Sequence, residues 1–191
     1  MIDLHCHLLP GIDDGPATLE ESLELARIAV ADGITHAVVT PHIHPQRFDN
    51  NVSTIEPVFN QLKQALLEQG IELKLHSFAA ELRISAEMLS MIPAGQVPFL
   101  GEWEEKKVLL LEFPHSHIPP GSDKLTQWLL KQDIQPMIAH PERNKEIMRN
   151  TDKLAPFVEQ GCLFQLTAMS VTGEFGEQAQ QKSIELLERD W

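Results

Sequence analysis

Apolar and polar positions along the chain follow two different periods, which predict β-strands and α-helices in turn. The runs 34–40 and 108–112 are rich in Val, Ile and Leu, as is typical of buried strands. Between such runs, apolar residues recur at helical spacing, as at Leu19, Leu23 and Ala26. The pattern therefore predicts strands and helices that alternate along the whole chain.

Capping residues place the ends of several predicted helices. Thr18 and Glu21 form a capping box at the start of one helix, and Gly33 ends it. Ser53 and Glu56 predict a second box of the same kind. The predicted strands cover 1–4, 34–40, 71–78, 108–112, 135–139 and 162–166; the predicted helices cover 18–32, 53–70, 85–91, 122–132, 144–160 and 177–189, with a loop at 94–105.

Six strands and about six helices in strict alternation predict an α/β fold with parallel strands and helical connections. A (β/α) barrel and an open doubly wound sheet both fit this order. Polar residues follow nearly every predicted strand, which favours the barrel, because there all the carboxyl ends of the strands converge on one site. No Gly-rich phosphate loop follows a strand, which argues against a nucleotide-binding domain. Without repeats or linkers, the chain is predicted to be a single domain over residues 1–191.

Composition narrows the class of protein. The 191 residues include 15 basic and 28 acidic ones, and the formal charge of −13 disfavours nucleic-acid binding. The two cysteines, Cys6 and Cys162, are too few for a disulfide framework and fit a reducing compartment. The sequence has no signal-peptide pattern, and its apolar runs are far shorter than the roughly 18 residues of a membrane span. We therefore expect a cytoplasmic protein with no membrane insertion.

Metal-ligand residues follow successive predicted strands. His5 and His7 flank Cys6 on an extended segment, so the two imidazoles should face one way and the thiol the other. Together with them, five more residues form a predicted set of metal ligands: Asp14, His42, Glu81, Glu112 and His140. Spacing alone does not decide between Asp13 and Asp14.

Seven such residues exceed the need of a single ion. Imidazoles mixed with carboxylates favour zinc, manganese or iron over calcium or magnesium. Glu81 lies in the middle of the series and is the best candidate to bridge two ions. The other five histidines are interpreted as structural, surface or pocket-rim residues: His36, His44, His76, His115 and His117.

A cysteine-based phosphatase is excluded by position. Its C-x5-R motif would require an arginine at position 12 or 168, where the chain has Ile12 and Ala168. Cys6 is also expected to face away from the histidines. Any phosphatase chemistry would therefore depend on metal ions.

An ordered set of short motifs extends almost from end to end. H-x-H alone is weak, because amidohydrolases and TatD-like nucleases share it, but the set that ends in H-P-E-R is specific. On these motifs the chain resembles the PHP (polymerase and histidinol phosphatase) superfamily, and within it the capsule-synthesis branch of CpsB/YwqE-type metal-dependent tyrosine phosphatases. The matching segments are 1–7, 13–16, 40–42, 80–81, 111–113, 140–143 and 167–173.

The resemblance implies a distorted TIM-like (β/α)7 barrel and up to three divalent ions. Arg143 matches the arginine that contacts the substrate phosphate in the family, and Arg47 is a second candidate on position only. The family also has a D-x-H motif after a seventh strand; the only D-x-H of this sequence is Asp3-Leu4-His5 in the first predicted strand, and none follows the sixth predicted strand. We therefore expect the barrel to be C-terminally incomplete, with about six strands in this chain. The implied ligand sets are His5, His7 and Glu81 for the first ion, Glu81, Glu112 and His140 for the second, and Asp14 and His42 for the third.

The function implied by the resemblance is dephosphorylation of an autophosphorylating tyrosine kinase of capsular or exopolysaccharide synthesis. A metal-activated hydroxide would attack phosphorus while Arg143 holds the phosphoryl group. Manganese is the expected metal, with iron and zinc as alternatives. Two other functions stay open: another PHP or TatD-like phosphoesterase acting on small phosphates or nucleic-acid ends, and a degenerate metal-binding module without catalysis. Whether the protein forms a homo-oligomer is also left open.

Overall fold

The structure is a computed structural model that describes residues 1–191. By its internal contacts the chain divides into two compact units, Met1–Leu100 and Gly101–Trp191. Each unit contains parallel strands and helices, so the predicted α/β class is confirmed. No helix is both long enough and apolar enough to cross a bilayer.

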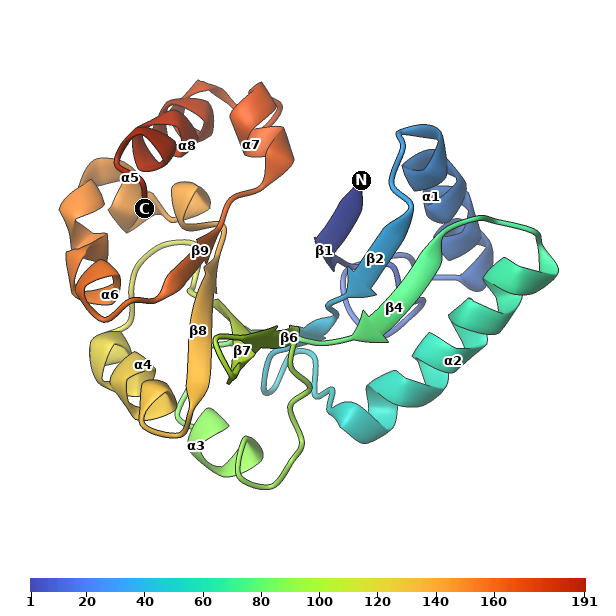
Figure 1. Ribbon diagram of the computed structural model, residues 1–191, viewed down its shortest axis with the longest axis horizontal. Helices are drawn as coiled ribbons and strands as arrows, with labels where there is room; N and C mark the ends of the chain where they lie inside the picture. The colour runs from blue at the N-terminus through green and yellow to red at the C-terminus, as the bar shows by residue number, and fades with distance from the viewer. The chain divides into compact units, whose positions relative to one another are not determined.

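The first unit is built on a parallel sheet in the order β1–β2–β4, with β3 and β5 as a second parallel pair. Helices α1 and α2 lie on the same side of the three-stranded sheet (Figure 1). The elements are β1 (Ile2–Cys6), α1 (Leu19–Ala31), β2 (His36–Val39), β3 (His42–Ile43), α2 (Val52–Glu68), β4 (Lys74–Phe78), β5 (Glu81–Arg83) and α3 (Met88–Met91).

Helix α2 carries an apolar stripe that the first unit buries. Ile55, Phe59, Leu62 and Leu66 follow one another at spacings of three and four residues, and all four are buried. Burial of each such side chain stabilises the fold by about 1.5–3 kcal/mol. The helix packs on β4, where the rings of Phe59 and Phe78 lie 5.3 Å apart, and β4 directly precedes the segment that carries Glu81.

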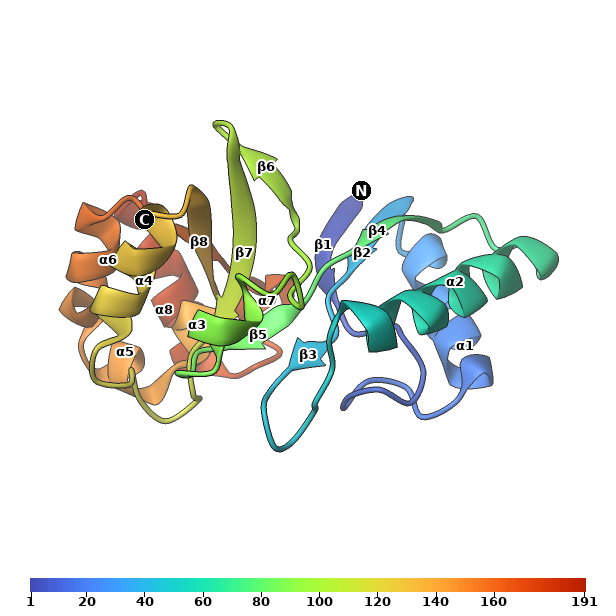
Figure 2. The same cartoon turned by 90° about the horizontal axis from the view of Figure 1, so that it is seen from below.

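In the second unit, β7, β8 and β9 are parallel neighbours, and β6 pairs with β7 in the antiparallel sense. Helices α4, α6 and α8 lie on one side of these strands (Figure 2). The elements are β6 (Gly101–Trp103), β7 (Lys106–Glu112), α4 (Ser122–Leu130), β8 (Ile134–Ala139), the 3-10 helix η1 (Pro141–Arg143), α5 (Lys145–Arg149), the 3-10 helix η2 (Thr151–Leu154), α6 (Ala155–Glu159), β9 (Leu163–Gln165), α7 (Ala168–Thr172) and α8 (Glu177–Glu188).

Strand β7 contains the continuous apolar run from Val108 to Leu111. Every residue from Val108 to Leu111 is at most 5% exposed, so both faces of the strand are covered. A continuous apolar run, rather than an alternating one, is typical of a central strand in a parallel sheet. In register, Leu110 pairs with Met137 on β8.

Two predicted helices differ from the observed ones. The second helix begins at Val52, because the side chain of Asn51 accepts hydrogen bonds from the backbone of Ser53 and Thr54; the predicted Ser53–Glu56 box is therefore wrong. The predicted helix 144–160 is also wrong. It is divided into α5, η2 and α6, because Asn150 is extended, its side chain caps η2, and Pro156 occupies the first turn of α6.

The structure has nine strands where about six were predicted. The additional ones are short: β3 and β5 begin at His42 and Glu81, and β6 lies in the predicted loop 94–105, so strict βα alternation is wrong there. The capping box of Thr18 and Glu21 is confirmed, since both of its hydrogen bonds form. Closure of the strands into a (β/α)7 barrel and a single domain over residues 1–191 stay predictions.

Candidate metal centre

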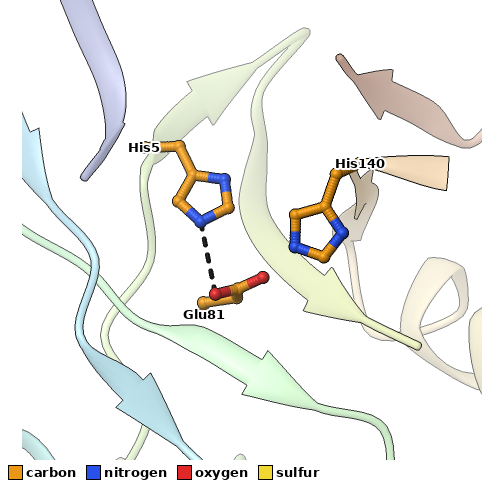
Figure 3. A group of neighbouring side chains, drawn as sticks. All are labelled: His5, Glu81 and His140. Carbon is orange, nitrogen blue, oxygen red and sulfur yellow. Dashed lines mark ion pairs between the residues drawn. The ribbon is translucent and has the colours of Figure 1, made fainter. Parts of the chain in front are cut away.

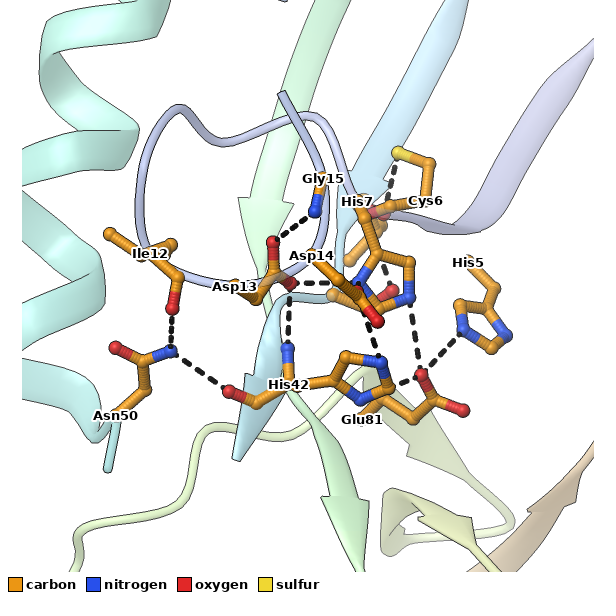
Figure 4. A network of polar contacts seen from close by, with 12 residues as sticks. His5, Cys6, His7, Ile12, Asp13, Asp14, Gly15, His42, Asn50 and Glu81 are labelled. Atoms are coloured by element: carbon orange, nitrogen blue, oxygen red, sulfur yellow. Dashed lines mark hydrogen bonds and ion pairs between the residues drawn. The ribbon is translucent and has the colours of Figure 1, made fainter. Parts of the chain in front are cut away.

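His5 in β1 and His7 directly after it diverge from Cys6, as expected for alternate residues of an extended backbone. The thiol of Cys6 lies 3.6 Å from the carbonyl oxygen of Val38, to which it donates a hydrogen bond. Its burial, with a smaller contribution from the charge of Asp3, raises the pKa of Cys6 far above its ordinary value. The imidazoles of His5 and His7 both reach Glu81 instead (Figure 4). A neutral, buried thiol has no role as a nucleophile here.

One carboxylate oxygen forms the centre of the cluster. Glu81 begins β5 just after β4, and its side chain is only 1% exposed. Its Oε2 lies 3.2 Å from Nε2 of His5, the ion pair drawn in Figure 3. The same oxygen lies 3.1 Å from Nε2 of His7 and 3.2 Å from Nδ1 of His42. Three imidazoles from two chain segments, residues 5–7 and His42, therefore converge on a single buried oxygen.

Asp14 lies in a second group of the same unit that could hold an ion. Single donor atoms of His7, Asp14 and His42 lie within 4.8 Å of one another. Nε2 of His42 is 3.3 Å from Oδ1 of Asp14, whose side chain is 50% exposed. The geometry thus favours Asp14 over Asp13 as a ligand, because its carboxylate points to the open side of the cluster.

Asp13 has a different task, which sequence spacing did not reveal. Its side chain is 1% exposed, and its Oδ2 accepts hydrogen bonds from Nδ1 of His7 at 2.8 Å and from the backbone N–H of His42 at 2.9 Å. Its Oδ1 accepts from the backbone N–H of Gly15 at 2.9 Å. An ionised carboxylate only accepts, so Nδ1 of His7 must carry a proton and Nε2 is directed at Glu81.

Burial and ion pairing oppose each other in the pKa values of these groups. Burial alone would lower the pKa of His7, but hydrogen bonds and charge interactions with Asp13 and Glu81 outweigh it and raise that pKa to about 10. Burial alone would raise the pKa of Asp13, but the hydrogen bonds that it accepts from His7, Gly15 and His42 outweigh burial and lower that pKa. For His42, burial dominates over the attraction of Glu81 and lowers the pKa.

These residues fit divalent metal ions. A buried carboxylate such as Glu81 needs a positive partner, and here the imidazolium of His7 provides it. A divalent ion could take over that role when His7 loses the proton on Nε2, because metal ligands must be deprotonated. The donor set of imidazole nitrogens and carboxylate oxygens suits zinc, manganese or iron. No single metal is selected by this donor set.

Asn50 ties the ligand loops together and was not predicted from the sequence. Its buried amide donates hydrogen bonds to the carbonyl oxygens of Ile12 at 2.8 Å and of His42 at 2.9 Å. Arg47 lies nearby on the chain, and its guanidinium carbon is 4.9 Å from the ring centroid of Phe48, which in turn stacks on His42. Arg47 is therefore linked to the cluster through Phe48.

The remaining predicted site residues belong to the second unit. Glu112 is the last residue of β7 and is 8% exposed. His140 follows β8, the parallel neighbour of β7, so both stand at carboxyl ends of adjacent strands. His140 has a left-handed backbone with φ of 34°, and its N–H donates to the carbonyl oxygen of Gln165 at 2.7 Å. A non-glycine residue in this conformation is held there by its surroundings.

The rest of the H-P-E-R segment is anchored by hydrogen bonds. Glu142 is fully buried and accepts from the backbone N–H of Thr167 at 3.0 Å. Asn144 caps α5, and its amide donates to Pro114 O at 2.8 Å. Between them, Arg143 is half-buried, and its guanidinium lies 4.4 Å from the ring centroid of Phe175. Hydrogen bonds thus anchor the residues on both sides of Arg143.

The other histidines lie outside the metal-ligand groups. His36 and His117 contact the hydroxyl oxygens of Thr35 and Ser116 through Nδ1, at 2.9 and 2.8 Å. Burial, assisted by Arg83 and Arg47, lowers the pKa of His44. The members of this set are His36, His44, His76, His115 and His117.

A buried carboxylate beside three imidazoles, at the carboxyl ends of parallel strands, is the arrangement expected of a metal-binding α/β protein. Comparison with known proteins gives the family. The model of the capsular polysaccharide synthesis family CpsB/CapC matches residues 1–191, and the chain belongs to this family.

Individual relatives agree with the family match. The chain is 36% identical over 188 residues to the tyrosine-protein phosphatase YwqE of Bacillus subtilis, covering 98% of this chain and 72% of YwqE. It is 27% identical to the tyrosine-protein phosphatase CpsB of Streptococcus pneumoniae, covering 100% of this chain and 79% of CpsB. A solved chain from the work on YwqE and CpsB, described as unique metal-dependent tyrosine phosphatases, matches with a TM-score of 0.89 at 36% identity, over 98% of this chain and 74% of that one.

Proposed function

We propose that this protein is a metal-dependent phosphatase that hydrolyses phosphotyrosine on proteins. Its substrate would be an autophosphorylating tyrosine kinase of capsular or exopolysaccharide synthesis, in the cytoplasm. The observation that carries the proposal is the convergence of three imidazoles on Oε2 of Glu81 at 3.1–3.2 Å. The names of the relatives, which are tyrosine-protein phosphatases of this family, supply the reaction class.

The residues of the first unit would hold the ions. His5, His7 and Glu81 provide one set of donors, and Asp14 with His42 provides another. Divalent ions bound there would supply activated water near neutral pH and offset the charge of the phosphate. Manganese is the first candidate, and up to three ions are proposed. Glu112 and His140 are proposed as further ligands on the resemblance and on their places after β7 and β8.

The protein's own residues would orient the substrate. Arg143 forms no ion pair in the structure, so its guanidinium is available for the bidentate contact that a phosphoryl group favours. Arg47 is proposed as a weaker second contact. The phenolate of tyrosine has a conjugate-acid pKa of about 10, so it leaves with less help from a general acid than an alkoxide does. Hydrolysis that relies on metal ions and Arg143 is therefore easier for phosphotyrosine than for phosphoserine.

The test compares substrates at fixed metal concentration. Phosphate release from a phosphotyrosine peptide, a phosphoserine peptide and a 5′-phosphorylated oligonucleotide would be measured with manganese and with a chelator. We expect turnover on the phosphotyrosine peptide alone, abolished by the chelator and reduced at least about 100-fold by Arg143→Gln, the loss typical of a transition-state contact. Faster turnover of the oligonucleotide would favour a TatD-like nuclease activity instead. No turnover of any substrate in a metal-loaded protein would refute the proposal.

A further inference from the structure

A pocket of about 810 Å³ in the second unit concentrates positive charge in a strongly acidic protein. Four of the chain's 15 Lys and Arg residues line it, although the formal charge of the whole chain is −13. The pocket lies where the segment after β8 meets α8, and Figure 1 shows α5 beside α8 at this place. The four are Arg143, Lys145, Arg149 and Lys182.

The charge of the pocket is largely uncompensated. Glu185 is its only acidic lining residue, and it already accepts bonds from Lys182, Thr151 and Arg189. These contacts, Lys182 first, lower the pKa of Glu185, so it stays ionised and balanced by its own partners. Arg143, Lys145 and Arg149 take part in none of the ion pairs of the structure. The pocket therefore presents three cationic side chains to solvent.

One of these three links the pocket to the proposed reaction. Arg143 is the proposed contact of the reacting phosphate, and its guanidinium rests on the ring of Phe175, another lining residue. The pocket is far larger than one phosphate group and lies in the range of sites that hold whole ligands. Lys145 and Arg149 begin and end α5, so the positive charge extends along that helix away from Arg143.

We infer that this pocket binds a second anionic group of the phosphopeptide substrate, a carboxylate or a further phosphate close in sequence to the phosphotyrosine. The inference rests on the proposed function and adds to it a substrate class: phosphotyrosine segments with nearby negative charge. Such a contact would select substrates without taking part in the chemical step. Because Lys145 and Arg149 are exposed, its strength should fall as ionic strength rises.

The experiment uses three phosphotyrosine peptides of equal length. One has neutral flanking residues, one has flanking Asp and Glu, and one carries a second phosphotyrosine. We expect KM to be about 3- to 10-fold lower for the two anionic peptides than for the neutral one, as exposed charge contacts allow, with similar kcat. The anionic peptide with the lower KM shows whether the pocket prefers a carboxylate or a second phosphate.

Two matched double variants locate the effect. Lys145→Gln with Arg149→Gln should remove the preference while leaving kcat on the neutral peptide unchanged. Lys124→Gln with Lys131→Gln removes the same charge from exposed positions on and just after α4, outside the pocket, and should keep the preference. Equal loss in both variants would mean that net charge alone attracts the peptide, and would overturn the inference.

The two proposals fail in distinguishable ways. Turnover with no preference among the three peptides would overturn the pocket assignment and leave the phosphatase function intact. If no peptide is hydrolysed, the function fails, and fluorescence anisotropy of labelled peptides still tests the pocket through the same variants. Tighter binding of single-stranded RNA than of either anionic peptide would also overturn the assignment.

Discussion

Asp13 offers the sharpest test of how the metal centre is built. The substitution Asp13→Asn keeps the size of the side chain but removes its charge and one acceptor oxygen. The native carboxylate accepts three hydrogen bonds, from His7 Nδ1 at 2.8 Å and from the backbone of His42 and Gly15 at 2.9 Å each. An amide cannot accept all three, because its nitrogen must face one of these donors.

The expected magnitude follows from the loss of orientation. Asp13 holds the proton of His7 on Nδ1, which leaves Nε2 for the ion. Loss of such a partner typically weakens metal affinity or activity by about 10- to 100-fold. The charge-assisted hydrogen bond itself contributes about 1.5–3 kcal/mol to stability, so a lower unfolding temperature is also expected.

The assay is a manganese titration followed by calorimetry, with turnover measured on the same samples. Asp49→Asn is the matched control, because Asp49 is an exposed aspartate that accepts from the backbone N–H of Gln46 in a turn of the same unit. The control should bind manganese as the native protein does. If Asp13→Asn keeps its manganese affinity within about twofold, the positioning role is refuted.

Three further predictions concern the loop, the charge state and the core. Gly15→Ala should weaken manganese binding about tenfold or more, because a Cβ there would lie 2.6 Å from the carbonyl oxygen of His7 and force the loop to move; unchanged affinity in a metal titration would contradict this. In metal-free protein, the stabilisation contributed by His7 should be complete below pH 6.5, its ordinary pKa, and be lost as pH rises to about 10, because folding raises that pKa. Urea unfolding with chelator should show a slope of up to about 1.4 kcal/mol per pH unit, and His7→Gln should remove it. Leu111→Ala should cost about 2–5 kcal/mol, since Leu111 is fully buried. Leu67→Ala at a 75% exposed position should change thermal stability little.

The sequence predicted much of the site because its ligands depend on strand order. Residues that follow parallel strands must meet at one edge of the sheet, so His5, His7, His42 and Glu81 could be grouped without coordinates. Helix α8 and the capping box of Thr18 could also be predicted from the sequence, because local periodicity and capping chemistry determine them.

Most features that the sequence did not predict are places where neighbouring residues offer two similar local structures. Asn51 and Ser53 are comparable N-cap residues, and the helix begins after Asn51, whose side chain accepts hydrogen bonds from the backbone of Ser53 and Thr54. Asn150 and Pro156 do mark breaks in the predicted helix 144–160, but its apolar spacing concealed them. The different roles of Asp13 and Asp14 depend on which side chain the loop buries. Two adjacent residues of the same type give no indication of this in the sequence.

The central claim is that a metal-loaded cluster centred on Glu81 hydrolyses phosphotyrosine. Its most direct test is the rate of phosphate release from a phosphotyrosine peptide by the native protein and by Glu81→Gln, each with saturating manganese and with chelator. The account predicts manganese-dependent turnover in the native protein and at least about a 1000-fold loss in Glu81→Gln, as when a catalytic group that acts with its neighbours is removed. Undiminished turnover in Glu81→Gln, or turnover in the native protein that the chelator does not reduce, would contradict this claim.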